Sequence, residues 1–106
     1  MPKYLATVNY TQAGLEGLLK DGGSKRRSVT EKLVDSLGGK LEAYYFAFGE
    51  TDAYVIADFP DNVSAATASL VVSAAGGATT SITVLMTPEE IDEAANKSAA
   101  YTAPGK

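Results

Sequence analysis

Two neighbouring segments of this chain, 41–48 and 52–59, are apolar on both of their alternating faces, and this feature constrains the fold most. The alternating sets are Leu41, Ala43, Tyr45 and Ala47 against Tyr44, Phe46 and Phe48, then Val55, Ala57 and Phe59 against Tyr54 and Ile56. A strand with one face in water alternates apolar with polar side chains. Both segments therefore predict strands that are covered on both faces.

Two further segments, 3–10 and 79–86, are rich in β-branched and aromatic residues and also predict strands. Gly49-Glu50-Thr51 is short enough to join the two central strands as an antiparallel hairpin, with Gly49 free to take a positive φ. The sequence thus predicts four strands.

Cap residues and apolar spacing predict the helices between these strands. Thr11 caps a short helix that carries Leu15, Leu18 and Leu19. Ser24 caps a second helix, with a stripe of Val29, Leu33 and Leu37 widened by Val34. Asp61 or Asn62 caps a third helix over 63–75, in which Ala66, Leu70 and Ala74 align. A fourth helix begins at Thr87-Pro88, with Glu90 completing its capping box. Paired glycines after the first three helices predict their ends.

The order of these elements is β-α(α)-β-β-α-β followed by a C-terminal helix, which predicts an α+β, ferredoxin-like fold. Right-handed crossovers place both long helices on one face of a four-stranded antiparallel sheet. Residues 1–97 form one domain and 98–106 a C-terminal tail. The other sheet face would then expose an apolar patch, so we expect a homo-oligomer packed sheet on sheet. A bound ligand or the C-terminal helix is the alternative cover.

Composition excludes several classes of function. The 106-residue chain has no Cys and no His, so we expect no disulfide, no thiolate or imidazole catalyst, and no metal or cofactor site. The net charge of −4 and the lack of a basic stripe argue against nucleic-acid binding. The absence of a signal peptide and of any long apolar stretch predicts a cytoplasmic protein without membrane contact.

Arg26 is the first candidate ligand-binding residue. At 100° per residue it lies near the centre of the apolar stripe of the second helix. A guanidinium there, at a helix start, is suited to a carboxylate or phosphate. The alternative is that Arg26 extends past the sheet edge and pairs with Glu50 or Asp52.

Four more candidates lie on the strands. Asp52 follows the hairpin turn and is suited either to a general base or to accepting backbone amides, of which we favour the second. Tyr54 and Asp58 share one face of the third strand, and Asn9 faces them from the first strand. We expect Tyr54, Asp58 and Asn9 either to provide polar groups within an otherwise apolar ligand pocket or to form hydrogen bonds across a subunit interface.

Several motifs resemble the GYD-domain family. They are the segment 38–52 (GGKLEAYYFAFGETD), Pro60-Asp61, Tyr10-Thr11-x-x-Gly14, Arg26 or Arg27, and 85–90 (LMTPEE). The resemblance implies a ferredoxin-like fold in an assembly of the dimeric α/β-barrel type. Gly49 and Asp52 match the pattern, whereas Thr51 stands where a tyrosine precedes the aspartate, so no role of that tyrosine is carried over.

Three functions follow as hypotheses. The favoured one is a homo-oligomeric module that binds a small molecule, with an anion as one candidate, in a pocket between its sheets, with Arg26 turned inward. The second is a cofactor-independent isomerase or monooxygenase of the dimeric α/β-barrel kind, with Asp52 or Tyr54 as acid or base; it rests on analogy of fold. The third is a structural or regulatory oligomer.

Overall fold

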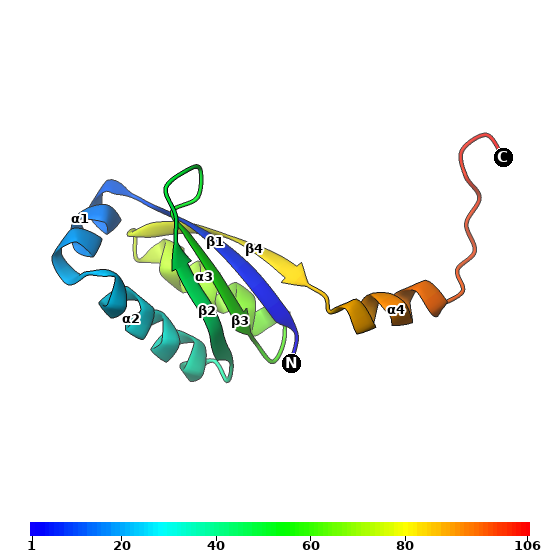
Figure 1. The fold of residues 1–106 in the computed structure, drawn as a ribbon, viewed down its shortest axis with the longest axis horizontal. Coiled ribbons are helices and arrows are strands. Elements are labelled where there is room, and N and C mark those ends of the chain that lie inside the picture. Colours follow the sequence, from blue (N-terminus) through cyan, green and yellow to red (C-terminus); the bar gives the residue numbers. More distant parts are fainter.

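The computed structural model describes residues 1–106, and its elements follow the predicted order (Figure 1). They are β1 (Lys3–Tyr10), α1 (Gln12–Asp21), α2 (Gly23–Ser36), β2 (Lys40–Phe46), β3 (Ala53–Asp58), α3 (Asn62–Ala74), β4 (Ala78–Leu85) and α4 (Pro88–Asn96). All strand pairs are antiparallel, in the order β2-β3-β1-β4. The predicted α+β, ferredoxin-like arrangement is confirmed.

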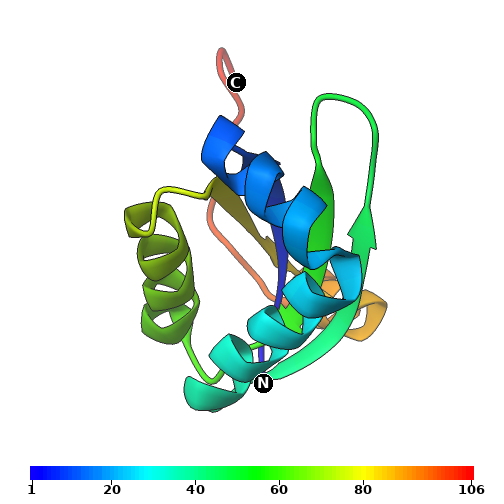
Figure 2. The same ribbon diagram turned by 90° about the vertical axis from the view of Figure 1, so that its left-hand side faces the viewer.

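The two long helices lie on the same face of the sheet, which we call the helix face (Figure 2). α2 packs on β2 at one edge and α3 packs on β4 at the other, with little direct packing between the two helices. The central strands β1 and β3 therefore run beneath the space between the helices. The opposite face, which we call the open face, is uncovered in the single chain.

The core on the helix face is built from small side chains. All 11 buried residues are apolar, and five of them are alanines. The largest aromatic contact in it is an edge-on packing of Tyr4 against Phe59, with ring centroids 5.7 Å apart. No large side chain is completely buried. The helices are therefore held to the sheet by limited apolar contact.

A β-bulge changes the predicted faces of β2. The pairing with β3 shifts between Leu41 and Ala43, so one extra residue stands in β2 there. Leu41 consequently lies on the same face as Tyr44 and Phe46, whose partners Val55 and Ala53 belong to the core. The prediction that Leu41 shares a face with Ala43 and Tyr45 was wrong, because strict alternation does not anticipate a bulge.

Three local predictions were also wrong. α2 starts at Gly23 with Gly22 as its cap, so Ser24 lies inside the helix. Gly49 does not have a positive φ. The buried face of α3 is Ala65, Ala68 and half-buried Val72, whereas the predicted stripe of Ala66, Leu70 and Ala74 is exposed. α3 is apolar nearly all round, so spacing alone does not select which side meets the sheet.

The predicted helix ends are largely confirmed. The side chains of Thr11 and Asp61 accept backbone amide hydrogens at the starts of α1 and α3, and Thr87 and Glu90 form a capping box at α4. The Asp61 carboxylate accepts the amide of Ser64, which lowers the pKa of Asp61. Left-handed glycines follow the first three helices, namely Gly22, Gly38 and Gly76.

Residues 86–106, which we call the C-terminal arm, extend away from the rest of the chain (Figure 1). They contain α4, they are exposed along their whole length, and no hydrogen bond or ion pair joins them to residues 1–85. The arm makes the molecule 58 Å long but only 32 and 22 Å in its other dimensions. None of the helices has the length and apolar character needed to span a membrane.

Candidate functional site

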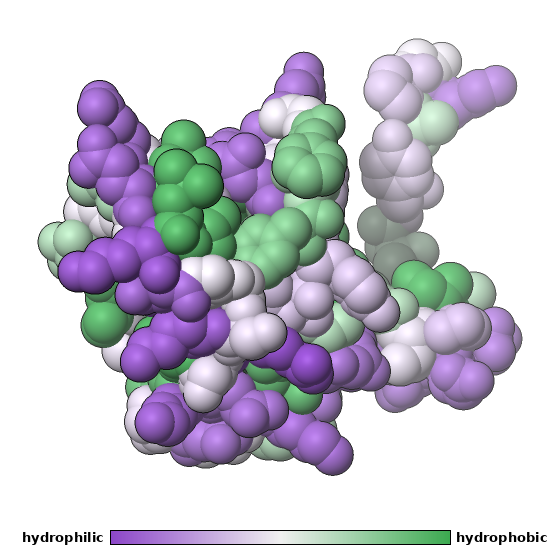
Figure 3. Space-filling view, turned by 60° about the vertical axis from the view of Figure 1, so that its left-hand side comes forward, coloured by the Kyte–Doolittle hydropathy of each residue, from purple (hydrophilic) through white to green (hydrophobic).

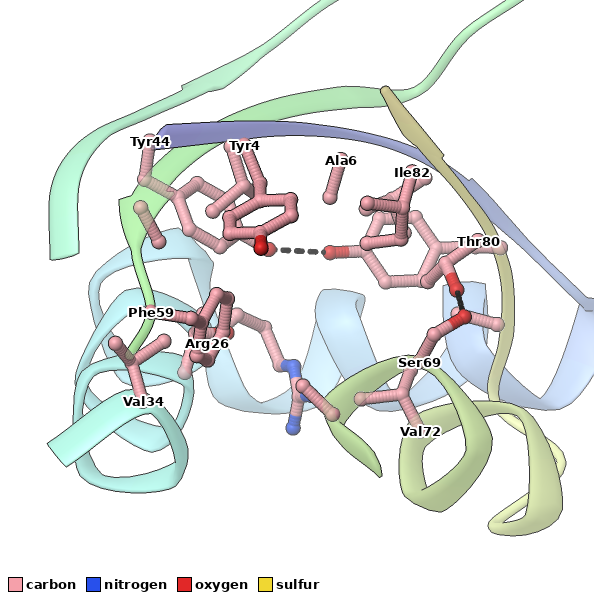
Figure 4. A pocket seen from close by; sticks show the side chains of 17 residues that line it. Tyr4, Ala6, Arg26, Val34, Tyr44, Phe59, Ser69, Val72, Thr80 and Ile82 are labelled. Atoms are coloured by element: carbon pink, nitrogen blue, oxygen red, sulfur yellow. Dashed lines mark hydrogen bonds between the residues drawn. The ribbon is translucent and has the colours of Figure 1, made fainter. Parts of the chain in front are cut away.

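A cavity of about 80 Å³ lies on the helix face, between the sheet and the two long helices (Figure 4). Its floor is formed by the four strands, with β2 contributing Tyr44, and its walls by α2 and α3. Alanines line it from four elements, namely Ala6, Ala57, Ala68 and Ala78. Because α2 and α3 do not close over these alanines, space remains between the layers.

A second hollow of about 340 Å³, the outer cleft, lies between α1, α2 and α3. It shares Tyr10, Arg26, Val72 and Ala78 with the cavity, so the two spaces adjoin at these side chains. Its remaining lining is mostly small or aliphatic, with Asp21 as its acidic member. The cavity therefore borders a larger hollow at the position of Arg26.

Two tyrosine hydroxyl groups meet inside the cavity. The hydroxyl oxygens of Tyr10 on β1 and Tyr44 on β2 are 2.8 Å apart, and either can be the donor (Figure 4). Both rings pack against Phe46, which holds them in place. Burial, and then the hydrogen bond with Tyr10, raise the pKa of Tyr44 above its ordinary value. The Tyr44 hydroxyl therefore keeps its proton at physiological pH.

A second hydroxyl pair lies on the α3 side of the cavity. Ser69 of α3 and Thr80 of β4 are hydrogen-bonded through their side-chain oxygens (Figure 4). This contact ties α3 to β4 at a position where both residues line the cavity. The cavity thus has apolar walls with two hydroxyl pairs and the hydroxyl groups of Tyr4 and Thr30 among its lining residues.

Arg26 provides the one positive charge of the cavity lining. It stands in the first turns of α2 and is half-buried, and its guanidinium lies in the space between α2 and α3, on the side away from the sheet (Figure 4). It makes no ion pair, since both ion pairs of the chain involve Lys3. The alternative prediction, that Arg26 pairs with Glu50 or Asp52, was therefore wrong.

Asp52 has a structural role and lies outside the cavity. Its carboxylate accepts the backbone amide of Tyr10 at 2.9 Å, and its own amide donates to Val8. These bonds tie the hairpin to the end of β1, which agrees with the role that we favoured. Asp52 borders a third hollow, an apolar groove with Leu15, Leu18, Phe46 and Phe48 around it. Hydrophobic side chains gather at this end of the molecule (Figure 3).

The remaining three predicted residues lie on the open face. Tyr54 alternates with the core residues of β3, and Asn9 alternates with the cavity residues of β1. Asp58 accepts a hydrogen bond from Lys3 at 2.9 Å, and Glu42 lies 3.1 Å from the same ammonium group. The sheet therefore separates Arg26 from these residues, and the structure does not bring the five candidates together.

Sequence reasoning did not assign the cavity hydroxyls to a site. Tyr44 was named only as a member of one strand face and Tyr10 only as part of a family motif, and neither Ser69 nor Thr80 was proposed for a site. The sequence nevertheless contained a signal for these four residues. Each of them shares a strand or helix face with apolar residues of the core. Polar groups at core positions are the usual sign of a ligand-contacting wall or a buried network.

The arrangement is suited to binding. No carboxylate lines the cavity, and the chain has no group of acidic residues spaced to hold a metal ion. Asp52 and Tyr54, the acid–base candidates, lie elsewhere, and burial raises the pKa of Tyr44, so its hydroxyl stays protonated and does not act as a base. The cavity thus offers one guanidinium, several hydroxyl groups and apolar walls.

A protein-family model described as the GYD domain matches residues 4–95. The chain belongs to the GYD-domain family. The match covers all four strands and the first three helices, which confirms the resemblance seen in the sequence. No curated protein and no solved structure matches this GYD chain. The boundary between domain and tail at residues 97 and 98 stays a prediction.

Proposed function

We propose that this GYD-domain protein binds a small anionic molecule in the cavity on its helix face, with Arg26 as the anchor of the negative charge. The observation that supports the proposal is the unpaired Arg26 guanidinium beside an apolar cavity. Partial desolvation of a charge costs free energy that a counter-charge offsets, and Arg26 has no such partner in the chain. An anionic ligand would supply that counter-charge.

The surroundings of Arg26 strengthen its affinity for an anion. Apolar walls exclude water from one side of the guanidinium, and electrostatic interactions are stronger in such low-dielectric surroundings. The planar guanidinium can form two parallel hydrogen bonds with a carboxylate. The apolar walls at the same time take up the hydrocarbon part of the ligand.

Direct titration tests this proposal. Thermal shift and calorimetry with a panel of small carboxylates, and with inorganic phosphate, should find ligands that raise the melting temperature. Arg26→Gln should weaken binding by roughly 10- to 100-fold, the value of a charge-assisted hydrogen bond. Arg27→Gln is the matched control, because Arg27 is the next residue of the same helix and is exposed. Binding by no anion in the panel, or equal losses in both variants, would refute the proposal.

We further propose that a second copy of the chain covers the open face. Leu5, Tyr54 and Ile56 stand on this face beside Ala43 and Tyr45, which together form an apolar surface on β2, β3 and β1. Tyr45 is 71% exposed and Tyr54 43% in the single chain. Aromatic side chains of this kind are enriched where proteins associate. The packing would be sheet on sheet, so the cavities would remain on the outer sides of the assembly.

A further inference from the structure

The volume of the cavity limits the ligand. At about 80 Å³ it has roughly half the volume of an apolar cavity that accepts benzene, which measures about 150 Å³. A ring is therefore too large for the inner part of the cavity. The inner part of the ligand is instead a short chain of a few carbon atoms, entering from the outer cleft.

The charges at the entrance limit the ligand further. The guanidinium of Arg26 is the one cation shared by the cavity and the outer cleft, and the carboxylate of Asp21 borders the same cleft. Asp21 repels any anion, but it repels a dianion such as phosphate about twice as strongly as a monoanion, and the single guanidinium balances only one negative charge. The entrance therefore suits a monocarboxylate.

The hydroxyl pairs add a requirement for a hydrogen-bond acceptor. Three hydroxyl groups meet here, because Thr30 of α2 also lines the cavity and lies beside the Tyr44 hydroxyl. The bond between Tyr10 and Tyr44 uses one of the three protons, and the contact of Thr30 with Tyr44 uses a second. One proton is left to be donated. A plain hydrocarbon chain beside it would leave this donor without a partner, which costs free energy.

From these three constraints we infer that the ligand is a short monocarboxylic acid that carries a second oxygen, as a keto or hydroxy group. Its carboxylate binds Arg26, and its second oxygen accepts a hydrogen bond from the Tyr10–Tyr44 pair (Figure 4). The inference rests on the proposed function, since it concerns the same cavity. It specifies the class of anion that the cavity is expected to bind.

The experiment compares acids that differ by one oxygen. The matched pairs are pyruvate with propionate, 3-hydroxybutyrate with butyrate, and 4-oxopentanoate with pentanoate, each titrated by calorimetry. For at least one pair, the oxygenated acid should bind about 3- to 10-fold more tightly, the value of one hydrogen bond between neutral groups. In Tyr44→Phe or Tyr10→Phe that ratio should fall to near one. Tyr101→Phe is the control, because Tyr101 is exposed in the C-terminal arm and belongs to neither the cavity nor the open face, and it should keep the ratio.

The possible results distinguish an error in the inferred ligand class from an error in the proposed function. Equal affinities within every pair in the wild-type protein would refute the inference and leave the proposed function standing. A preference that persists in both cavity variants would also refute it, because another group would then recognise the oxygen. Tighter binding of benzoate or phosphate than of any short acid would overturn the inferred class. Failure of every anion would refute the proposed function, and the inference with it.

Discussion

The two faces of the sheet differ in how their apolar residues are covered. On the helix face, α2 and α3 cover the outer strands, and small residues such as Ala6 and Ala57 leave a cavity over the central ones. On the open face no helix or loop of the chain covers the sheet. The apolar residues of this face lie toward β2 and β3. The part of the open face on β4 is polar, with Thr79, Ser81 and Thr83.

The comparison shows that two apolar faces of one sheet can be suited to different kinds of binding partner. The concave, incompletely filled helix face has a cation at its entrance and is suited to a small molecule. The flat open face has aromatic side chains and is suited to another protein surface. Sequence analysis expected the ligand pocket and the subunit contact on the same face, whereas in the structure the cavity and the apolar open face lie on opposite sides of the sheet.

The largest expected effect is the loss of a core aromatic residue on the helix face. Phe59 is 4% exposed and packs edge-on against Tyr4. Phe59→Ala should lower the free energy of unfolding by about 3–5 kcal/mol, because it removes buried apolar contacts and enlarges a space that is already incompletely filled. Urea denaturation measures this. Thr83→Ala on the open face should change stability by less than about 0.5 kcal/mol. Similar losses in the two variants would contradict the contrast between the faces.

The next effect concerns assembly through the open face. Tyr54→Glu places a charge at the centre of the proposed contact and should weaken association by at least about 30-fold, the effect of losing a central interface residue. Analytical ultracentrifugation over a concentration series measures this. Ser73→Glu adds the same charge to the exposed side of α3 and should leave the mass unchanged. A wild-type protein that stays monomeric at high concentration would refute the proposed assembly.

The fold was predictable from the sequence because each strand and helix has its own local signal. Thr11 and Thr87 cap their helices through backbone bonds within one turn, and such short-range interactions can be inferred from neighbouring residues. The bulge at Leu41 and Ala43 was not predictable in this way, because it depends on how β2 pairs with β3. α3 likewise has too uniform a sequence for its buried side to be predicted.

The candidate site was predictable only in part. Arg26 was found because a charge within an apolar stripe is a local anomaly, and it does line the cavity. The Tyr10–Tyr44 contact joins residues 34 positions apart, and it requires knowing that both rings point to the helix face. Asn9, Tyr54 and Asp58 were placed correctly with respect to each other, but the small-molecule cavity lies on the opposite side of the sheet.

A cavity-filling substitution tests whether the empty volume serves binding. Ala6 lies on the central strand β1 and lines the cavity. Ala6→Val adds two methyl groups and suits a strand, so it should raise the free energy of unfolding by about 1 kcal/mol while abolishing ligand binding. Denaturation and calorimetry on the same variant measure both effects. If binding persisted in a stabilised variant, the ligand would have to lie in the outer cleft and not in the cavity.

The smallest effect compares the two faces at alkaline pH. Tyr44 on the helix face and Lys3 on the open face both have a raised pKa, the first mainly through burial and the second mainly through its hydrogen bond with Asp58. Above about pH 10 the unfolded chain releases these protons before the folded chain does, so the free energy of unfolding falls as pH rises. Each group contributes at most about 1.4 kcal/mol per pH unit, and Lys3, which is solvent-accessible, contributes much less. Denaturation between about pH 9 and 12 should therefore show a clearly shallower fall in Tyr44→Phe and only a slight change in Lys3→Met. A larger change in Lys3→Met than in Tyr44→Phe would mean that the Tyr44 hydroxyl is open to solvent. The description of an apolar cavity on the helix face would then be contradicted.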